Sequence, residues 1–91
     1  MRRIGANRAN IYIVVAKNIK YYRKSKNLTQ AQLAEKTGYS HEFIRRIEGP
    51  NSGKNFSLDT VSNIANALDI DIELLFEKND LENESETEKQ P

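Results

Sequence analysis

The sequence predicts an all-α domain built from five short helices. Apolar residues recur at helical spacing in separate segments, and hydroxyl residues stand where several of these segments begin. Glycine, asparagine and other turn-forming residues separate the segments. None of the segments is long enough to form a stable helix alone, so we expect packing between them to hold the domain together.

The chain begins with a polar, basic segment. Residues 1–9 carry three arginines and one glycine, a composition that predicts a flexible arm. The arginines are Arg2, Arg3 and Arg8.

The first predicted helix runs from about residue 10 to Lys26 and is closed by Asn27. Its apolar side chains recur at helical spacing, at Ile11, Val15, Ile19 and Tyr22. The β-branched residues between Ile11 and Val15 also suit a short strand, so two interpretations of this start remain open.

The second predicted helix covers about residues 30–37. Thr29 can cap it, with Gln32 placed for a capping box. Gly38 ends it, since the left-handed conformation at such an end favours glycine. Leu33 and Ala34 form its apolar side.

The third predicted helix covers about residues 41–48, with Ser40 as its cap. Ile44 and Ile47 lie one turn apart and are expected to face inward. The outward side then carries His41, Glu42, Arg45 and Arg46. Two helices, a glycine turn and a polar outer face predict a helix-turn-helix at about residues 30–48, a motif that places its second helix in the DNA major groove.

Two more helices follow a turn-rich loop, GPNSGKN. Ser57 can cap a helix over about 58–68, and Asp71 can cap another over about 72–78. The predicted inner face of the first is Leu58, Val61, Ile64, Ala65 and Leu68; the second carries Leu74, Leu75 and Phe76.

Charge divides the chain unevenly. Residues 77–91 hold six acids and two lysines, a balance of −4, whereas residues 1–76 hold 12 basic and 7 acidic residues, a balance of +5. A basic body suits a polyanion partner. We therefore expect an arm at 1–9, a DNA-binding domain at 10–78 and an acidic, disordered tail at 79–91.

Composition argues against several other classes. The chain has no cysteine, which excludes a disulfide scaffold and agrees with a reducing cytoplasm. With His41 as the only histidine, we expect no metal site and no cofactor. No nucleophile, base and orienting group stand in a recognisable order, so we expect no enzyme. No apolar run approaches the roughly 20 residues of a membrane span.

The segment from about Val15 to Phe76 resembles the phage repressor/Cro type (XRE-like) of bacterial helix-turn-helix regulators. The matching residues are Gln30, Leu33, Ala34, Gly38, Ile44, Ile47, Glu48 and Gly49. The chain departs from the family at Thr37, where an aliphatic residue is usual, and in its longer loop. The resemblance implies a compact lambda-repressor-like domain that regulates transcription, as a repressor or autoregulator, by binding double-stranded DNA as a homodimer on a pseudo-palindromic operator.

Base contacts are expected from the outer face of the third helix. Arg45 and Arg46 can pair with guanine, and Glu42 can accept from cytosine. His41 lies beside them, in the first turn. The alternative is a solvated helix face, which is the common role of such residues.

Phosphate contacts are expected from the helix starts and the long loop. The resemblance implies that Gln30 holds a phosphate at the start of its helix, and Ser40 can add a second contact. Lys54 and Asn55 lie in the loop that the family places on the DNA backbone. The arginines of the arm either reach a neighbouring groove or make no contact.

The resemblance also implies a partly buried ion pair. It joins Arg23, near the end of the first helix, to Glu48, at the end of the third helix.

Dimerisation is expected through the C-terminal half. The fifth helix is too short to bury all its apolar residues, so with Leu74 facing inward the exposed set would be Ile70, Ile72, Leu75 and Phe76. The competing site is the segment from Ile11 to Val15, which can pair as strands.

An antitoxin or adaptor is the alternative function. Its main role would be to bind a protein partner, with the acidic segment covering a basic surface. A selection of bound sequences from a random DNA pool separates the two hypotheses.

Overall fold

The computed structural model describes residues 11–49 and 56–78. Within these ranges all regular structure is helical, which confirms the predicted class. The helices are α2 (Ile11–Ser25), α3 (Gln30–Thr37), α4 (His41–Glu48), α5 (Leu58–Leu68) and α6 (Glu73–Phe76).

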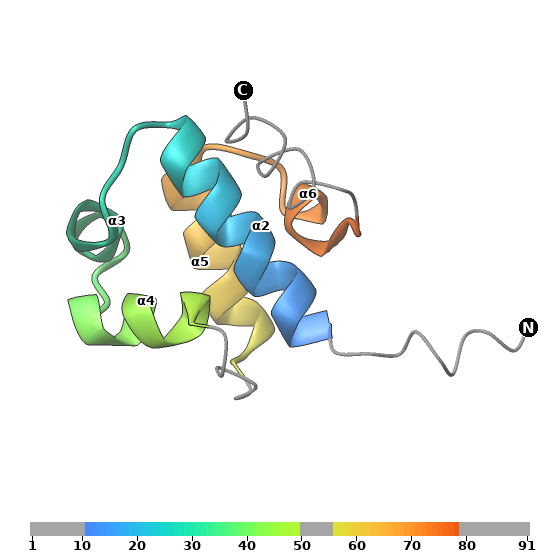
Figure 1. Cartoon of the computed structure of the whole chain (residues 1–91), viewed down its shortest axis with the longest axis horizontal. Helices are drawn as coiled ribbons and strands as arrows, with labels where there is room; N and C mark the ends of the chain where they lie inside the picture. The colour runs from blue at the N-terminus through green and yellow to red at the C-terminus, as the bar shows by residue number, and fades with distance from the viewer. Residues whose placement is uncertain (1–10, 50–55, 79–91) are drawn as a thin grey trace, which may run out of the picture.

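Helix α2 crosses in front of α5 in the centre of the domain (Figure 1). In this view α3 and α4 lie on one side of α2, and α6 lies on the other. The buried core draws on every helix and consists of Val15, Ile19, Leu33, Ala34, Ile44, Ile47, Val61, Ile64, Ala65, Leu68 and Leu75. Each helix contributes only a few of these side chains. No helix can therefore bury its apolar side without packing against the others.

The first residues of α2, which the sequence allowed to be either helix or strand, are helical. Residues 11–15 are helical, and Val15 and Ile19 are buried while Ile11 is exposed. The helix ends at Ser25, one residue before the predicted end at Lys26, and Asn27 closes the following turn in a left-handed conformation, with φ +61°. Its buried Asn18 donates through Nδ2 to the carbonyl oxygens of Leu75 and Glu77, both at 2.8 Å, and so ties α2 to the end of α6.

The ends of α3 and α4 are set by local residues as predicted. Thr29 and Gln32 form the reciprocal capping box, with bonds of 3.0 Å and 2.8 Å. Gly38 ends α3 at φ +85°, and Ser40 Oγ caps α4 by accepting from the Phe43 N–H at 3.0 Å. The predicted bounds of both helices are confirmed.

Helix α5 matches its predicted range, with Ser57 as its cap. The prediction that Leu58 faces inward is wrong, because Leu58 is 68% exposed. It stands at the first position of the helix, one turn before the buried stripe begins at Val61.

Helix α6 differs most from the prediction. It covers four residues rather than 72–78, its first residue follows Ile72, and no side chain caps it, so Asp71 is not the predicted cap. Leu75 is fully buried in the core and Leu74 is only half-buried, which reverses their predicted roles. The physical reason is that Asn18 holds the Leu75 and Glu77 carbonyls against α2. Successive helical side chains point about 100° apart, so burying Leu75 turns Leu74 outward.

No helix in the two described ranges is long and apolar enough to cross a membrane.

Candidate nucleic-acid interface

The outer face of α4 is a continuous polar surface. His41, Glu42, Arg45 and Arg46 are exposed, whereas Ile44 and Ile47 are buried on the opposite side. Arg45 Nη2 lies 3.8 Å from Glu42 Oε2, at the outer limit of an ion pair, and both side chains are exposed. This contact is weak, so Arg45 remains available to another acceptor.

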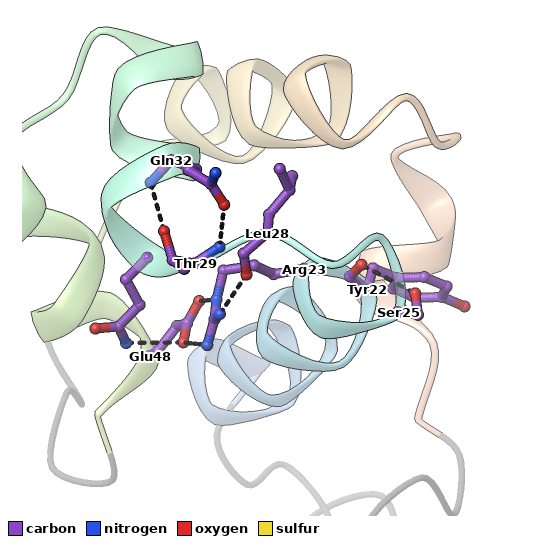
Figure 2. A network of polar contacts seen from close by, with 8 residues as sticks. Tyr22, Arg23, Ser25, Leu28, Thr29, Gln32 and Glu48 are labelled. Carbon is purple, nitrogen blue, oxygen red and sulfur yellow. Dashed lines mark hydrogen bonds and ion pairs between the residues drawn. The ribbon is translucent and has the colours of Figure 1, made fainter.

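Helix α4 is fixed from behind by a buried ion pair. Arg23 Nε and Nη2 donate to the two carboxylate oxygens of Glu48, at 2.8 Å and 2.9 Å (Figure 2). The remaining Arg23 nitrogen, Nη1, donates to the Leu28 carbonyl at 2.7 Å. Only 8% of the Arg23 side chain and 2% of the Glu48 side chain are exposed. The pair joins the end of α2 to the end of α4, where the resemblance implied it.

Gln30 belongs to the same network, a contact that the sequence analysis did not predict. Its Nε2 donates to Glu48 Oε1 at 3.0 Å. A carboxylate only accepts hydrogen bonds, so this contact orients the amide with its nitrogen toward Glu48. The nitrogen keeps one further N–H at the start of α3, available to an external acceptor.

The turn between α3 and α4 is held by the Thr37 hydroxyl. The Thr37 hydroxyl lies 2.9 Å from the Leu33 carbonyl oxygen and 3.0 Å from that of Ala34, and it accepts from the Tyr39 N–H at 3.3 Å. Thr37, the position at which the chain departs from the residue that the resemblance implies, thus supplies a hydroxyl that closes α3.

Tyr39 is a positioning residue that the sequence did not reveal. Its hydroxyl accepts from Asn63 Nδ2 on α5 at 2.8 Å, and its ring lies against Phe43, with centroids 4.9 Å apart. This links the turn before α4 to α5 and holds the start of α4. Asn63 is 24 residues away, so no local pattern predicted the contact.

Several predicted site residues lie outside the described ranges. These are Arg2, Arg3 and Arg8 of the arm and Lys54 and Asn55 of the loop. The same holds for the predicted disorder of residues 79–91.

The predicted dimer surface is only partly available. Ile70, Ile72 and Phe76 are half-buried and pack against the core, and Leu75 is within it. A shallow hollow at this end of the domain is lined by Asn66, Asp69, Ile70, Asp71 and Leu74. On the competing N-terminal segment, Ile11 and Ile13 are exposed.

Within the described ranges no group of three or more metal-ligating side chains comes together.

Comparison with known proteins places this geometry among DNA-binding regulators. A family model described as helix-turn-helix matches residues 19–75. The chain is 34% identical over 71 residues to control protein C.SmaI of Serratia marcescens, an alignment that covers 78% of this chain and 82% of that protein. It is 36% identical over 76 residues to the immunity repressor protein of Bacillus phage phi105, covering 84% of this chain but only 51% of the repressor.

Two solved structures share the fold. The restriction-modification controller protein C.AhdI of Aeromonas hydrophila superposes with a TM-score of 0.65 at 28% identity, covering 71% of this chain and 96% of that chain. The hypothetical transcription factor NHTF from Neisseria superposes with a TM-score of 0.70 at 21% identity, covering 82% and 84%. The second likeness extends to the fold alone.

Proposed function

Because the chain belongs to the helix-turn-helix family whose model matches residues 19–75, it is a DNA-binding transcriptional regulator, and we propose that it acts as a homodimeric repressor or autoregulator. The observation that carries the proposal is the outer face of α4, where four polar side chains stand together while two isoleucines anchor the helix from behind. A helix of this kind fits the major groove.

The base contacts that we propose come from His41, Glu42, Arg45 and Arg46. Arginine can make two parallel hydrogen bonds to guanine, and each such pair discriminates by about 1–3 kcal/mol. Glu42 repels phosphate, so its place on this face favours a specific role such as accepting from cytosine. Its weak contact with Arg45 leaves both side chains free to rearrange against bases.

The phosphate contacts that we propose begin with Gln30. The amide orientation set by Glu48 leaves an N–H at the start of α3, where the helix dipole also favours an anion. Ser40 is a second candidate, since its oxygen accepts from Phe43 while its hydroxyl proton remains available. Lys54, Asn55 and the arginines of the arm complete the proposed set.

The dimer that we propose closes through the C-terminal end, with Leu74 in place of the buried Leu75. Leu74 and Ile70 line the shallow hollow beside α6, and Ile72 and Phe76 are partly exposed next to it. A two-fold axis here would set two reading helices on one DNA face, about 34 Å apart. The competing interface is the exposed side of Ile11 and Ile13.

The relatives favour a local regulatory role. One is named a control protein and another an immunity repressor, so we propose that this chain likewise controls a small set of promoters by occupying operators. We also propose a cytoplasmic location, since the DNA target of a bacterial regulator lies there.

Selection of bound sequences from a random duplex pool tests the proposal. We expect enrichment of a two-fold symmetric site whose half-sites are centred about one helical turn apart. The selection is repeated with Arg46→Ala, which removes a proposed base contact. Lys36→Ala, which removes an exposed charge on α3, is the matched control. Failure of the intact chain to enrich any sequence would contradict operator binding and favour the protein-binding alternative.

The interface needs a separate test. Leu74→Glu should weaken the dimer in sedimentation equilibrium and reduce operator affinity, whereas Ile13→Glu should do neither. The reverse result would move the interface to the start of α2.

A further inference from the structure

The outer side of α2 carries a row of lysines. Lys17, Lys20 and Lys24 are all exposed, and their spacing of three and four residues places them on one side of the helix. We call these three residues the lysine face. Helix α2 contains no Asp or Glu, so no acid of the same helix offsets the repulsion among them.

The described chain ends beside this face. The Asn18 amide, which follows Lys17 in sequence, holds the carbonyl oxygens of Leu75 and Glu77 at 2.8 Å. Burial raises the pKa of the Tyr22 hydroxyl, and the negative charge of Glu77 raises it further, so the Glu77 carboxylate lies toward the flank of α2 that carries both Asn18 and Tyr22. At about 100° per residue, this flank borders the lysine face but is not part of it. The described chain therefore ends close to a point that is held against the helix carrying the lysine face.

The chemistry of residues 79–91 complements the lysine face. Five acids stand at every second position from residue 80 to residue 88, and Lys89 is the only basic residue. In an extended chain alternate side chains point to one side, at intervals of about 6.6–7 Å. Along a helix, steps of three and four residues rise about 4.5 Å and 6 Å, so the two rows of charge have comparable spacing.

The distances are also within reach. Four residues from Lys78 to Glu82 extend up to about 14 Å, which exceeds the helix diameter of about 10–12 Å, so the acids can pass from the Asn18 flank of α2 to the lysine face. A short tether raises the effective concentration of the acids to the millimolar range, which favours their own helix over that of another copy.

We propose that residues 79–91 dock on the lysine face of their own α2 and mask it from other polyanions. Each lysine–glutamate contact is weak at an exposed site, but several contacts on one tether act together. Masking would confine DNA binding to the surface of α3 and α4. These helices lie on the other side of α2 from α6, the last described helix (Figure 1). The inference requires neither the operator nor the dimer.

Paramagnetic labelling of the full-length protein tests the docking directly. The chain has no cysteine, so Ser85→Cys gives a single site for a spin label within the acidic row. At about 20 mM salt we expect selective broadening of the amide signals of Lys17, Lys20 and Lys24, and its loss at about 500 mM salt, where charges are screened beyond a few ångströms. Broadening centred on α4, or none on α2 at low salt, would overturn the proposal.

Matched variants separate docking from general attraction. Lys20→Gln with Lys24→Gln should remove the broadening, whereas Lys26→Gln with Lys36→Gln removes the same charge elsewhere and should leave it. Equal loss in both variants would contradict a specific face. Mixing spin-labelled protein with isotope-labelled, cysteine-free protein should transfer no broadening to α2, since transfer would show that the occupant is another copy.

A mutant cycle, with affinity for nonspecific DNA as the readout, tests whether the acidic segment masks the lysine face. Changing Glu82, Glu84 and Glu86 together to glutamine should raise affinity for a nonspecific duplex about three- to tenfold at low salt. With Lys17, Lys20 and Lys24 also changed to glutamine, the gain should largely disappear. An equal gain in both backgrounds would mean that the acids repel DNA without covering the lysine face. Operator selection by the unaltered protein is a separate readout, so failure of the masking is distinguishable from failure of the proposed function.

Discussion

At the scale of single residues, Glu48 connects the interior of the domain to Gln30 at the start of α3, part of the proposed DNA-binding surface. Its carboxylate accepts two bonds from buried Arg23 and one from Gln30. The family resemblance implied the first partner because both residues belong to a known pattern. It did not imply the second partner, since the choice of rotamers decides whether the Gln30 amide turns toward Glu48 or toward solvent.

Arg23→Ala should strongly destabilise the fold. It leaves the Glu48 carboxylate buried with only the Gln30 amide, and breaking one side of a buried pair costs about 3–5 kcal/mol. Urea unfolding followed by circular dichroism measures this cost. Arg45→Ala is the control, because removing an exposed partner should cost less than about 1 kcal/mol. Equal effects would mean that the buried pair adds nothing to stability.

Arg46→Ala and Gln30→Ala should weaken DNA binding in different ways. We expect Arg46→Ala to cost about 1–3 kcal/mol per half-site and to relax the preference at one base pair. Gln30→Ala should weaken all sequences about equally, because phosphates carry no sequence information. Titrations of the operator and of single-base variants measure both effects. An unchanged specificity profile for Arg46→Ala would contradict the assigned reading face.

At the scale of helices, local signals predicted α3 and α4 well and α6 poorly. Thr29, Gly38 and Ser40 act on backbone groups only a few residues away, so their effects are visible in the sequence. The orientation of α6 depends instead on Asn18, which is 57 residues from Leu75. The exposure of Leu58 likewise depends on where the core ends, which no spacing of apolar residues reveals.

Gly38→Ala should destabilise the protein through its backbone alone. A Cβ at this position would meet nothing within 4 Å, but the residue has φ +85°, and a left-handed conformation costs an L-residue about 1–2 kcal/mol. Gly49→Ala is the control, since its φ is −71° and its nearest contact would be 3.4 Å from a carbonyl oxygen. Thermal unfolding should separate the two variants, and an equally stable Gly38→Ala would remove the conformational argument.

Leu75→Ala should destabilise the protein more than Leu74→Ala. Leu75 is fully buried, so its truncation leaves a cavity and should cost about 2–5 kcal/mol. Leu74 is half-buried, so its truncation should lower the stability of the monomer clearly less. Unfolding at low protein concentration measures both without a contribution from dimerisation. A larger loss for Leu74→Ala would restore the orientation predicted from the sequence.

At the scale of the whole molecule, the number of phosphates that the basic surface neutralises determines how DNA affinity responds to salt. If each half-dimer neutralises about three or four phosphates, log K should fall with log salt at a slope of roughly −5 to −7. Operator titrations at several salt concentrations give the slope. A value shallower than about −2 would contradict a groove-docked dimer.

The separation of buried and exposed positions on α4 has a consequence for how such a protein changes its target. The four outward side chains take no part in the apolar core, while the helix is anchored by Ile44, Ile47 and Glu48. Substitutions on the outward face can therefore accumulate without a folding penalty, since surface changes usually alter stability by less than about 0.5 kcal/mol. A duplicated copy could drift to a new operator one base pair at a time and remain folded at every step.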